Sequence, residues 1–246
     1  MTATAARRRP DPAQFADAAA LPWDAIAASL DAYGYATVPG LLDAEACRAL
    51  IGLYGEPDRF RSRIVMQRHA FGSGEYQYFG YPLPPLVRAL RDAAYPHLAA
   101  IANRWDESLG QPADFPAALD DYLDRCHRAG QTRPTPLMLK YGPGDYNRLH
   151  RDLYGDLVFP LQMAVLLSAP GEDFEGGEFL LVEQRPRTQS RAEVVPLARG
   201  DAVIFPVHHR PAEGTRGFYR LAMRHGVSRV RAGERYCLGV IFHDAA

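Results

Sequence analysis

The strongest constraint on the fold is a series of short β-type runs that starts near Pro136 and continues to the C-terminus. Runs rich in β-branched and aromatic side chains alternate with turn pairs such as Pro143-Gly144 and Gly200-Asp201. The pattern predicts eight strands, over residues 137–141, 149–152, 161–168, 178–182, 193–197, 202–205, 219–227 and 235–242. Eight short strands at this spacing are typical of a closed barrel or a jelly roll.

The residues before this series favour helices. The apolar periodicity predicts helices over 24–33, 44–54, 85–105 and 116–129, with Asp24 and Asp43 as N-caps, a short strand over 35–38 and a loop over 75–82. The 21 glycines and 20 prolines suit a β-rich chain better than a helical bundle. We therefore expect one domain over 1–246, mainly β with flanking helices (α+β). In it, residues 1–135 form a mostly helical support and residues 136–246 form the β core.

Charge is balanced over the whole chain but not along it. With 28 basic and 29 acidic residues the net charge is −1, which excludes a bulk polycation. Residues 185–235 nevertheless hold eleven arginines and four acidic residues. Such a segment suits a phosphate track, but arginines that alternate along strands also suit a solvated outer face, and we favour the solvated face.

The sequence also bears on the compartment. No apolar run approaches the length of a membrane span, and residues 1–10 contain arginines without the apolar core of a secretory signal. Cys47, Cys126 and Cys237 are odd in number and far apart, as expected for reduced, buried thiols. We therefore expect a cytoplasmic protein that does not contact membranes.

His150 and Asp152 are the first candidate metal ligands. Side chains at i and i+2 of a strand point to the same face, so this imidazole and this carboxylate can converge on one ion. Two histidines and one carboxylate that leave positions open are typical of non-haem Fe(II) oxygenases. Among the later histidines, His225 is preferred over His208 and His209 as the third ligand. Arg235 follows it by ten residues at the start of the last strand, where a guanidinium could bind a dicarboxylate; His208 and His209 then belong to a polar loop.

Four aromatic residues gather in the predicted loop: Tyr76, Tyr78, Phe79 and Tyr81. They could form a lid that stacks on an extruded base, or a hydrophobic plug at one end of the barrel. Alternation would place Tyr76 and Tyr78 on one side and Phe79 and Tyr81 on the other, so all four cannot belong to a lid. We favour the plug.

Several motifs, taken together, resemble the 2-oxoglutarate/Fe(II)-dependent dioxygenase superfamily, with spacing similar to its prolyl-hydroxylase-like branch. The resemblance covers residues 136–243 and rests on Tyr141, Gly144, His150-x-Asp152, Gly176-Gly177-Glu178, Gly200-Asp201-x-x-x-Phe205, His225 and Arg235. It implies a double-stranded β-helix (jelly-roll, cupin-like) core.

The resemblance also implies a site. Fe(II) would be bound by His150, Asp152 and His225, and O2 would be the oxidant. Arg235 would bind the distal carboxylate of the cosubstrate 2-oxoglutarate, and Tyr141 would donate a hydrogen bond to it. The branch that hydroxylates proline often has lysine at the position of Arg235, which weakens the assignment to that branch and leaves the cosubstrate unchanged.

Longer runs, such as residues 140–147, 150–156 and 183–191, look like those of a bacterial group described as oxidative demethylases of damaged nucleic acid. That description implies a nucleic-acid substrate and a role in DNA repair. A hydroxylase of a protein side chain, a free amino acid or a small metabolite is the second interpretation. A cupin-like binding module without turnover is the third. Asn147, Arg148, Tyr154 and Gln162 flank the metal motif and are further candidates for the pocket. The sequence does not indicate an oligomeric state.

Overall fold

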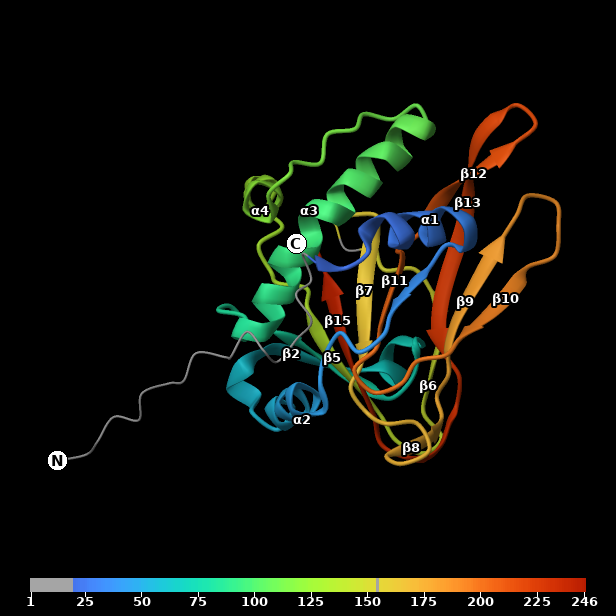
Figure 1. Ribbon diagram of the computed structural model, residues 1–246. Coiled ribbons are helices and arrows are strands. Elements are labelled where there is room, and N and C mark those ends of the chain that lie inside the picture. Colours follow the sequence, from blue (N-terminus) through green and yellow to red (C-terminus); the bar gives the residue numbers. More distant parts are fainter. Residues whose placement is uncertain (1–19, 154) are drawn as a thin grey trace.

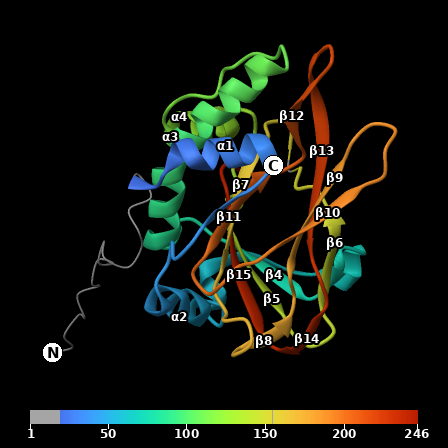
Figure 2. The same ribbon diagram turned by 45° about the vertical axis from the view of Figure 1, so that its right-hand side comes forward.

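The computed structural model describes residues 20–153 and 155–246. Within them, two β-sheets face each other, and helices cover the outer side of one sheet (Figures 1 and 2). The N-terminal arginines and Tyr154 lie outside the described residues. This arrangement confirms the expected double-stranded β-helix with flanking helices.

The larger sheet has seven strands among the described residues, all paired antiparallel. In spatial order they are β1 (Ala36–Val38), β11 (Ala202–Pro206), β7 (Leu161–Leu166), β15 (Arg235–Ile241), β5 (Leu137–Tyr141), β4 (Glu75–Phe79) and β2 (Phe60–Val65). In this order the last strand of the chain, β15, lies between β7 and β5 at the centre of the sheet.

The smaller sheet carries two of the predicted metal ligands, His150 and His225. Its strands are, in spatial order, β10 (Arg191–Val195), β9 (Phe179–Gln184), β13 (Gly217–Val227), β6 (Tyr146–His150) and β3 (Gly72–Ser73), and β12 (His209–Gly214) pairs with the far half of β13. A separate pair, β8 (Phe174–Gly176) and β14 (Val230–Gly233), lies at one end of the two sheets.

The predicted pattern of strands and loops needs correction, because the structure also has the strands β2, β3, β8, β12 and β14, which were not predicted. The predicted loop over 75–82 contains β4, whose residues pair with β2 on one side and with β5 on the other. Aromatic side chains favour strands, and the partner strands that complete the pairing are distant in sequence. The predicted strand over 149–152 is instead β6, which starts earlier and ends at His150.

The helices are close to those expected: α1 (Trp23–Tyr33), α2 (Ala44–Leu53), α3 (Pro85–Ser108) and α4 (Leu119–Arg128). Asp43 caps α2 as predicted, because its Oδ1 accepts a hydrogen bond from the Ala46 amide at 2.7 Å. The predicted cap Asp24 is wrong. Pro22 holds the N-cap position of α1, and Asp24 lies in the first turn.

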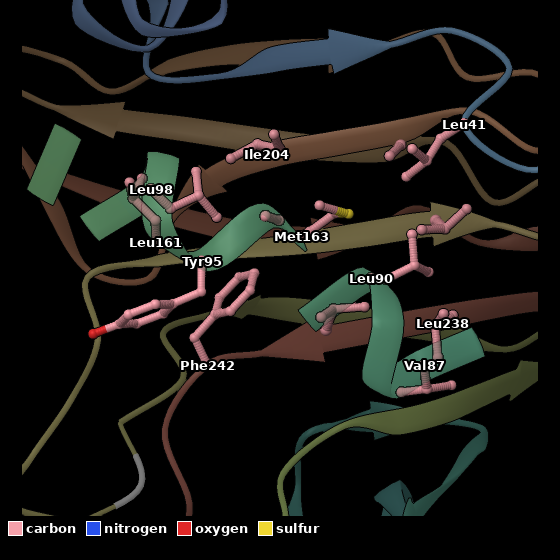
Figure 3. Close-up of a cluster of buried hydrophobic side chains, with 14 of the residues drawn as sticks. Leu41, Val87, Leu90, Tyr95, Leu98, Leu161, Met163, Ile204, Leu238 and Phe242 are labelled. Carbon is pink, nitrogen blue, oxygen red and sulfur yellow. The ribbon is translucent and has the colours of Figure 1, made fainter. Parts of the chain in front are cut away.

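The main hydrophobic core lies between α3 and the outer face of the larger sheet (Figure 3). Leu90 and Tyr95 of α3 are fully buried and belong to one cluster with Met163, Leu238 and Phe242 of the sheet side. Burial of these apolar side chains is the main contribution to the stability of the packing between the helices and the larger sheet. The helices therefore stabilise the back of the larger sheet and leave its front face to the smaller sheet.

A buried ion pair anchors α3 to the end of β15. Arg91 donates to the carbonyl oxygens of Ile241 at 2.8 Å and His243 at 3.1 Å, and to the carboxylate of Asp244 at 2.9 Å. Arg91 and Asp244 are completely buried. His127 Nε2 lies 2.8 Å from the second carboxylate oxygen of Asp244. The C-terminal segment is thus held by charge as well as by apolar contacts.

Two further expectations concern the environment of the chain. No helix among the described residues is long and apolar enough to cross a membrane. Cys47, Cys126 and Cys237 are all buried and unpaired, as predicted.

We expect Asp244→Asn to destabilise the fold strongly, although the substitution leaves the volume of the side chain almost unchanged. Loss of one member of a buried ion pair costs about 3–5 kcal/mol, because the other charge stays buried without compensation. Asp92→Asn is the matched control, since Asp92 pairs with Arg88 at the surface. Chemical denaturation of both variants measures the difference, and equal stability of Asp244→Asn and the wild type would contradict the role of the pair.

The same pair makes the stability pH-dependent. Burial acts to raise the pKa of Asp244, but Arg91 and His127 lower it below its usual value of 3.8. The carboxylate therefore contributes its full stabilisation above pH 3.8, and this contribution is lost as the pH falls through the lowered pKa. We expect the stabilities of the wild type and Asp244→Asn to converge in acid.

Candidate metal centre

A cavity of about 290 Å³ lies between the two sheets. Its walls come from β6 and β13 on one side and from β5, β7, β11 and β15 on the other, which Figure 2 shows as two facing layers. Large apolar side chains line much of it, among them Leu139, Phe179 and Phe205. The polar groups that converge in this apolar space are the candidates for chemistry.

The three predicted metal ligands meet in this cavity. His150, Asp152 and His225 place ligand atoms within 4.8 Å of one another, and no other cluster of this kind occurs among the described residues. The Nε2 atom of His225 lies 3.1 Å from one carboxylate oxygen of Asp152, and that of His150 lies 3.4 Å from the other. Two imidazoles and one carboxylate at these distances form a face that can bind one divalent ion.

The sheet pairing explains this convergence. β13 and β6 run antiparallel, and His225 pairs directly with His150. Side chains of directly paired residues stand side by side on the same face of a sheet, and the two ring centres are 4.2 Å apart. Asp152 lies beyond the end of β6, so the strand alternation that predicted its direction does not apply. The chain turns after His150 and still carries the buried carboxylate back to the two rings.

A backbone hydrogen bond sets the tautomer of His150. Its Nδ1 lies 2.7 Å from the carbonyl oxygen of Arg148, which can only accept a hydrogen bond. Nδ1 therefore donates a hydrogen bond to this carbonyl, and Nε2 is the ring atom that faces Asp152. An outer hydrogen bond of this kind is the usual way in which proteins orient a metal-binding histidine.

The electrostatics suit a metal as well. Burial acts to raise the pKa of Asp152, but His225 and His150 lower it well below its usual value. Burial lowers the pKa of His225. At neutral pH the site therefore presents an ionised carboxylate and a neutral imidazole, which are the protonation states that a metal ion requires.

Gln162 of β7 reaches the triad from the opposite sheet. Its Nε2 donates to Oδ2 of Asp152 at 2.8 Å, and the glutamine is almost fully buried. Oδ2 of Asp152 thus accepts a hydrogen bond from the side-chain amide of Gln162, while Oδ1 of Asp152 faces His150. Of the other residues that flank the motif, Asn147 also lines the cavity and donates to the Tyr141 hydroxyl at 3.3 Å, whereas Arg148 is exposed.

Arg235 places a positive charge at the other end of the cavity. It begins β15, pairs with Tyr141 of β5 and is only 2% exposed. Among the described residues, no carboxylate lies within 4.0 Å of its guanidinium, and its Nε has no hydrogen-bond partner. A buried cation is stable only when an anion or several acceptors compensate it. The site therefore fits an anionic ligand, such as a carboxylate, between Arg235 and the triad.

Arg235 and His225 lie on opposite sheets. β15 belongs to the larger sheet and β13 to the smaller sheet. Arg235 therefore faces the triad across the cavity. Tyr141 is fully buried beside it, with the guanidinium carbon 5.6 Å from the ring centre. Both predicted cosubstrate residues thus line the same cavity as the triad.

The aromatic stretch divides between the cavity and the core. Tyr76 lines the cavity, whereas Tyr78 packs against Leu137 and Ile241, and Phe79 lies in the main core. The Tyr81 hydroxyl donates to Asp244 at 2.8 Å, far along the chain. Most of the stretch therefore packs the interior as part of the larger sheet, and among these four residues Tyr76 alone lines the cavity.

The other sequence candidates lie elsewhere. His208 and His209 do not join the triad, and His209 begins β12 instead of lying in the expected loop. The arginines of residues 185–235 do not form one track. Arg235 is in the cavity, and Arg210 is buried against Glu183 at 3.4 Å, while most of the others are exposed.

Sequence reasoning did not point to the exposed residues of the cavity lining, among them Phe71 and Arg151. Phe71 belongs to no sequence motif. The long-range pairing of β3 with β6 places it at the cavity. Arg151 stands between two metal ligands, and only the turn after β6 directs it outward.

Comparison with known proteins identifies the family. Residues 74–245 match the Oxygenase-NA family, described as "Oxygenase, catalysing oxidative methylation of damaged DNA". Two proteins of Mycobacterium tuberculosis, "Uncharacterized protein MT2286" and "Uncharacterized protein Rv2227", are each 53% identical over 168 residues, which is 68% of this chain and 72% of theirs.

Solved structures show the same fold at low identity. A Pseudomonas putida prolyl-4-hydroxylase superposes with a TM-score of 0.53 at 15% identity, over 91% of this chain and 100% of the other. An oxidoreductase of the 2OG-Fe(II) oxygenase family from Burkholderia pseudomallei has the same TM-score at 16% identity, over 91% and 92%. The chain therefore belongs to the Oxygenase-NA family, and it has the fold of the 2OG-Fe(II) oxygenases.

Proposed function

We propose that this protein is an Fe(II)- and 2-oxoglutarate-dependent dioxygenase that oxidatively demethylates alkylated nucleic acid. The observation that carries the chemistry is the convergence of His150, Asp152 and His225 in one cavity with the uncompensated Arg235. The substrate class is supported by the description of the family, which names damaged DNA.

Each site residue has a role in this proposal. His150, Asp152 and His225 hold Fe(II), with the Arg148 carbonyl and Gln162 orienting the first two. Arg235 binds the distal carboxylate of 2-oxoglutarate through its guanidinium, and Tyr141 beside it donates a hydrogen bond to the same group. A cosubstrate held by Arg235 would lie in the same cavity as the three metal ligands.

The protein positions the reactants and excludes water. When bound, iron and 2-oxoglutarate supply the activation of O2 that inserts one oxygen atom into a C–H bond, with succinate and CO2 as coproducts. Leu139, Phe179 and Phe205 surround the site with apolar surface, which limits water near the reacting atoms. Fixed ligands and a fixed guanidinium reduce the entropy cost of bringing the reactants together.

The balance of atoms determines what becomes of a methyl group. Insertion of oxygen into an N–CH3 group gives N–CH2OH. The C–N bond then breaks, formaldehyde leaves, and a proton replaces the methyl group on nitrogen. The reaction that an oxygenase can perform on a methylated base is therefore removal of the methyl group.

The wider setting is part of the same proposal. We propose a single oxygenase domain over 1–246, with residues 136–246 as the catalytic core, in the cytoplasm. The buried, unpaired Cys47, Cys126 and Cys237 support a reducing compartment. The partners are 2-oxoglutarate and a nucleic-acid substrate.

We expect His225→Ala to abolish stoichiometric iron binding and succinate formation. Changes outside the ligand shell alone weaken a metal by about 10–100-fold, so loss of a ligand should exceed this. His209→Ala is the control, because His209 lies outside the triad. Metal analysis after anaerobic loading gives the iron content, and full loading of His225→Ala would refute the ligand set.

We expect Arg235→Met to weaken 2-oxoglutarate by about 10- to 150-fold, the range for losing a hydrogen bond to a charged group. Arg235→Lys should retain part of the affinity, because it keeps the charge and loses the planar fork. Arg231→Ala, at an exposed position, serves as the control. Calorimetric titration of the iron-loaded protein measures the change, and an unaltered affinity in Arg235→Met would exclude the assigned role.

We expect formaldehyde release from single-stranded oligonucleotides that carry N-methylated bases, in step with succinate. Release should stop in the His225→Ala variant. A panel of peptides, amino acids and small metabolites is assayed in parallel for hydroxylated products. Hydroxylation in that panel without formaldehyde would favour the metabolite or protein hydroxylase instead, and no Fe(II)-dependent turnover in either panel would favour a binding module.

A further inference from the structure

The mouth of the cavity is unusually apolar for an exposed surface. Phe71 and Leu153 line it and are 47% and 52% exposed. Exposed Arg151 lines it as well, next to Leu153. Large apolar side chains that stay exposed at the opening of a cavity indicate a surface that a ligand covers. The proposed function so far assigns no role to these residues.

Phe71 is carried by an excursion between the two sheets, residues 66–73. The chain leaves β2 of the larger sheet, forms the single 3₁₀ turn Met66–His69, and pairs as β3 with β6 of the smaller sheet. It then returns to the larger sheet as β4. This part of the chain (teal) lies beside β6 in Figure 2. The excursion thus spans the opening between the sheets.

The backbone of Phe71 is fixed although its ring is exposed. Its amide donates to the Met66 carbonyl at 3.2 Å, and its carbonyl accepts from the Arg148 amide at 2.9 Å. The next residue, Gly72, has a φ of 149°, and a Cβ there would meet the Tyr146 carbonyl oxygen at 2.3 Å. The glycine therefore permits the close approach that holds Phe71 against β6.

The ring of Phe71 has a partner on one side. It stacks on the exposed imidazole of His69, with centroids 5.4 Å apart and planes inclined by 21°. The pair forms a rigid aromatic platform at the mouth. A platform of this kind recognises flat π-systems, and nucleobases are the flat groups of the proposed substrate class.

Positive charge lies near the platform, because the exposed side chain of Arg151 belongs to the lining of the same cavity as Phe71. A guanidinium at this position can bind a phosphate adjacent to the bound base.

We propose that Phe71, backed by His69, stacks on an unpaired base as it enters the cavity, and that Arg151 binds a neighbouring phosphate. This assignment rests on the proposed nucleic-acid function and extends it to a strand whose target base is unstacked. A base inside a duplex cannot present its methyl group to a site between two sheets, whereas an unpaired or extruded base can. The platform, the guanidinium and the narrow cavity together fit a single strand.

The test measures oligonucleotide binding to the iron-loaded full chain with 2-oxoglutarate under nitrogen, so that no turnover occurs. The probes are a fluorescent single strand with one N-methylated adenine and the same strand with an abasic site at that position. We expect Phe71→Ala to weaken binding of the methylated strand by about 5- to 150-fold, the range for loss of one base–aromatic stack. The abasic strand should bind both proteins with similar, weak affinity.

Matched variants separate stacking from general damage. Phe71→Trp should retain affinity, and Phe218→Ala, which removes an equally exposed ring outside the cavity lining, should leave it unchanged. Phe71→Leu keeps apolar volume without a flat ring and replaces the alanine variant if that variant unfolds. Arg151→Gln should make the dependence of log affinity on log salt shallower by about 0.7, the contribution of one phosphate on a single strand.

The outcomes distinguish this inference from the function on which it rests. If the wild type binds and demethylates the strand and neither Phe71→Ala nor Phe71→Leu changes affinity, the platform is refuted while the function stands. If the wild type neither binds nor demethylates any strand, the nucleic-acid function is refuted, and the assigned occupant of the mouth with it. Loss confined to the methylated strand supports the platform.

Discussion

The antiparallel pairing of β6 with β13 is the contact on which the site depends. It places His150 opposite His225 on the inner face of the smaller sheet. A shift of one residue in this register would turn one imidazole toward the outside, because side chains alternate between the faces of a strand. The geometry of the metal site therefore depends on this long-range strand pairing as well as on the presence of the two histidines. β9 pairs along the other edge of β13, opposite His225 and its neighbours, and restricts such a shift.

Between the sheets, the protein keeps charges that its own residues do not neutralise completely. Asp152 is compensated by two histidines and an amide, whereas Arg235 has no carboxylate within salt-bridge distance among the described residues. Buried charges of this kind cost folding free energy unless ligands compensate them. The apolar core behind the larger sheet and the Arg91–Asp244 pair offset this cost far from the cavity. Stability and ligand binding are thus located on opposite faces of one sheet.

Sequence reasoning succeeded where the signal was local. The run that forms β5 has the expected bounds, and Asp43 caps its helix as predicted, because the pattern of each lies within a few residues. The three metal ligands were also found from spacing and resemblance, and the structure brings them together.

The rest required contacts that no local pattern encodes. The sequence of β4 resembles a loop because its partner strands β2 and β5 come from other parts of the chain. Asp152 reaches the histidines from beyond the end of β6, where the alternation of side chains along a strand no longer sets its direction. Phe71 carries no motif, and its place at the mouth follows from three separate pairings: β2 with β4, β3 with β6, and the Phe71 carbonyl with Arg148. Side chains supplied by excursions of this kind become visible only in three dimensions.

The excursion over residues 66–73 has a consequence for how such a protein can diversify. It joins the sheets by two short pairings and contributes none of the three metal ligands, nor Arg235 or Tyr141. Its length and side chains can therefore vary among descendants of a common ancestor while the reactive centre is inherited intact. In this architecture, new substrates can be reached by changing the exposed residues of this excursion of about eight residues, without a change to the metal ligands.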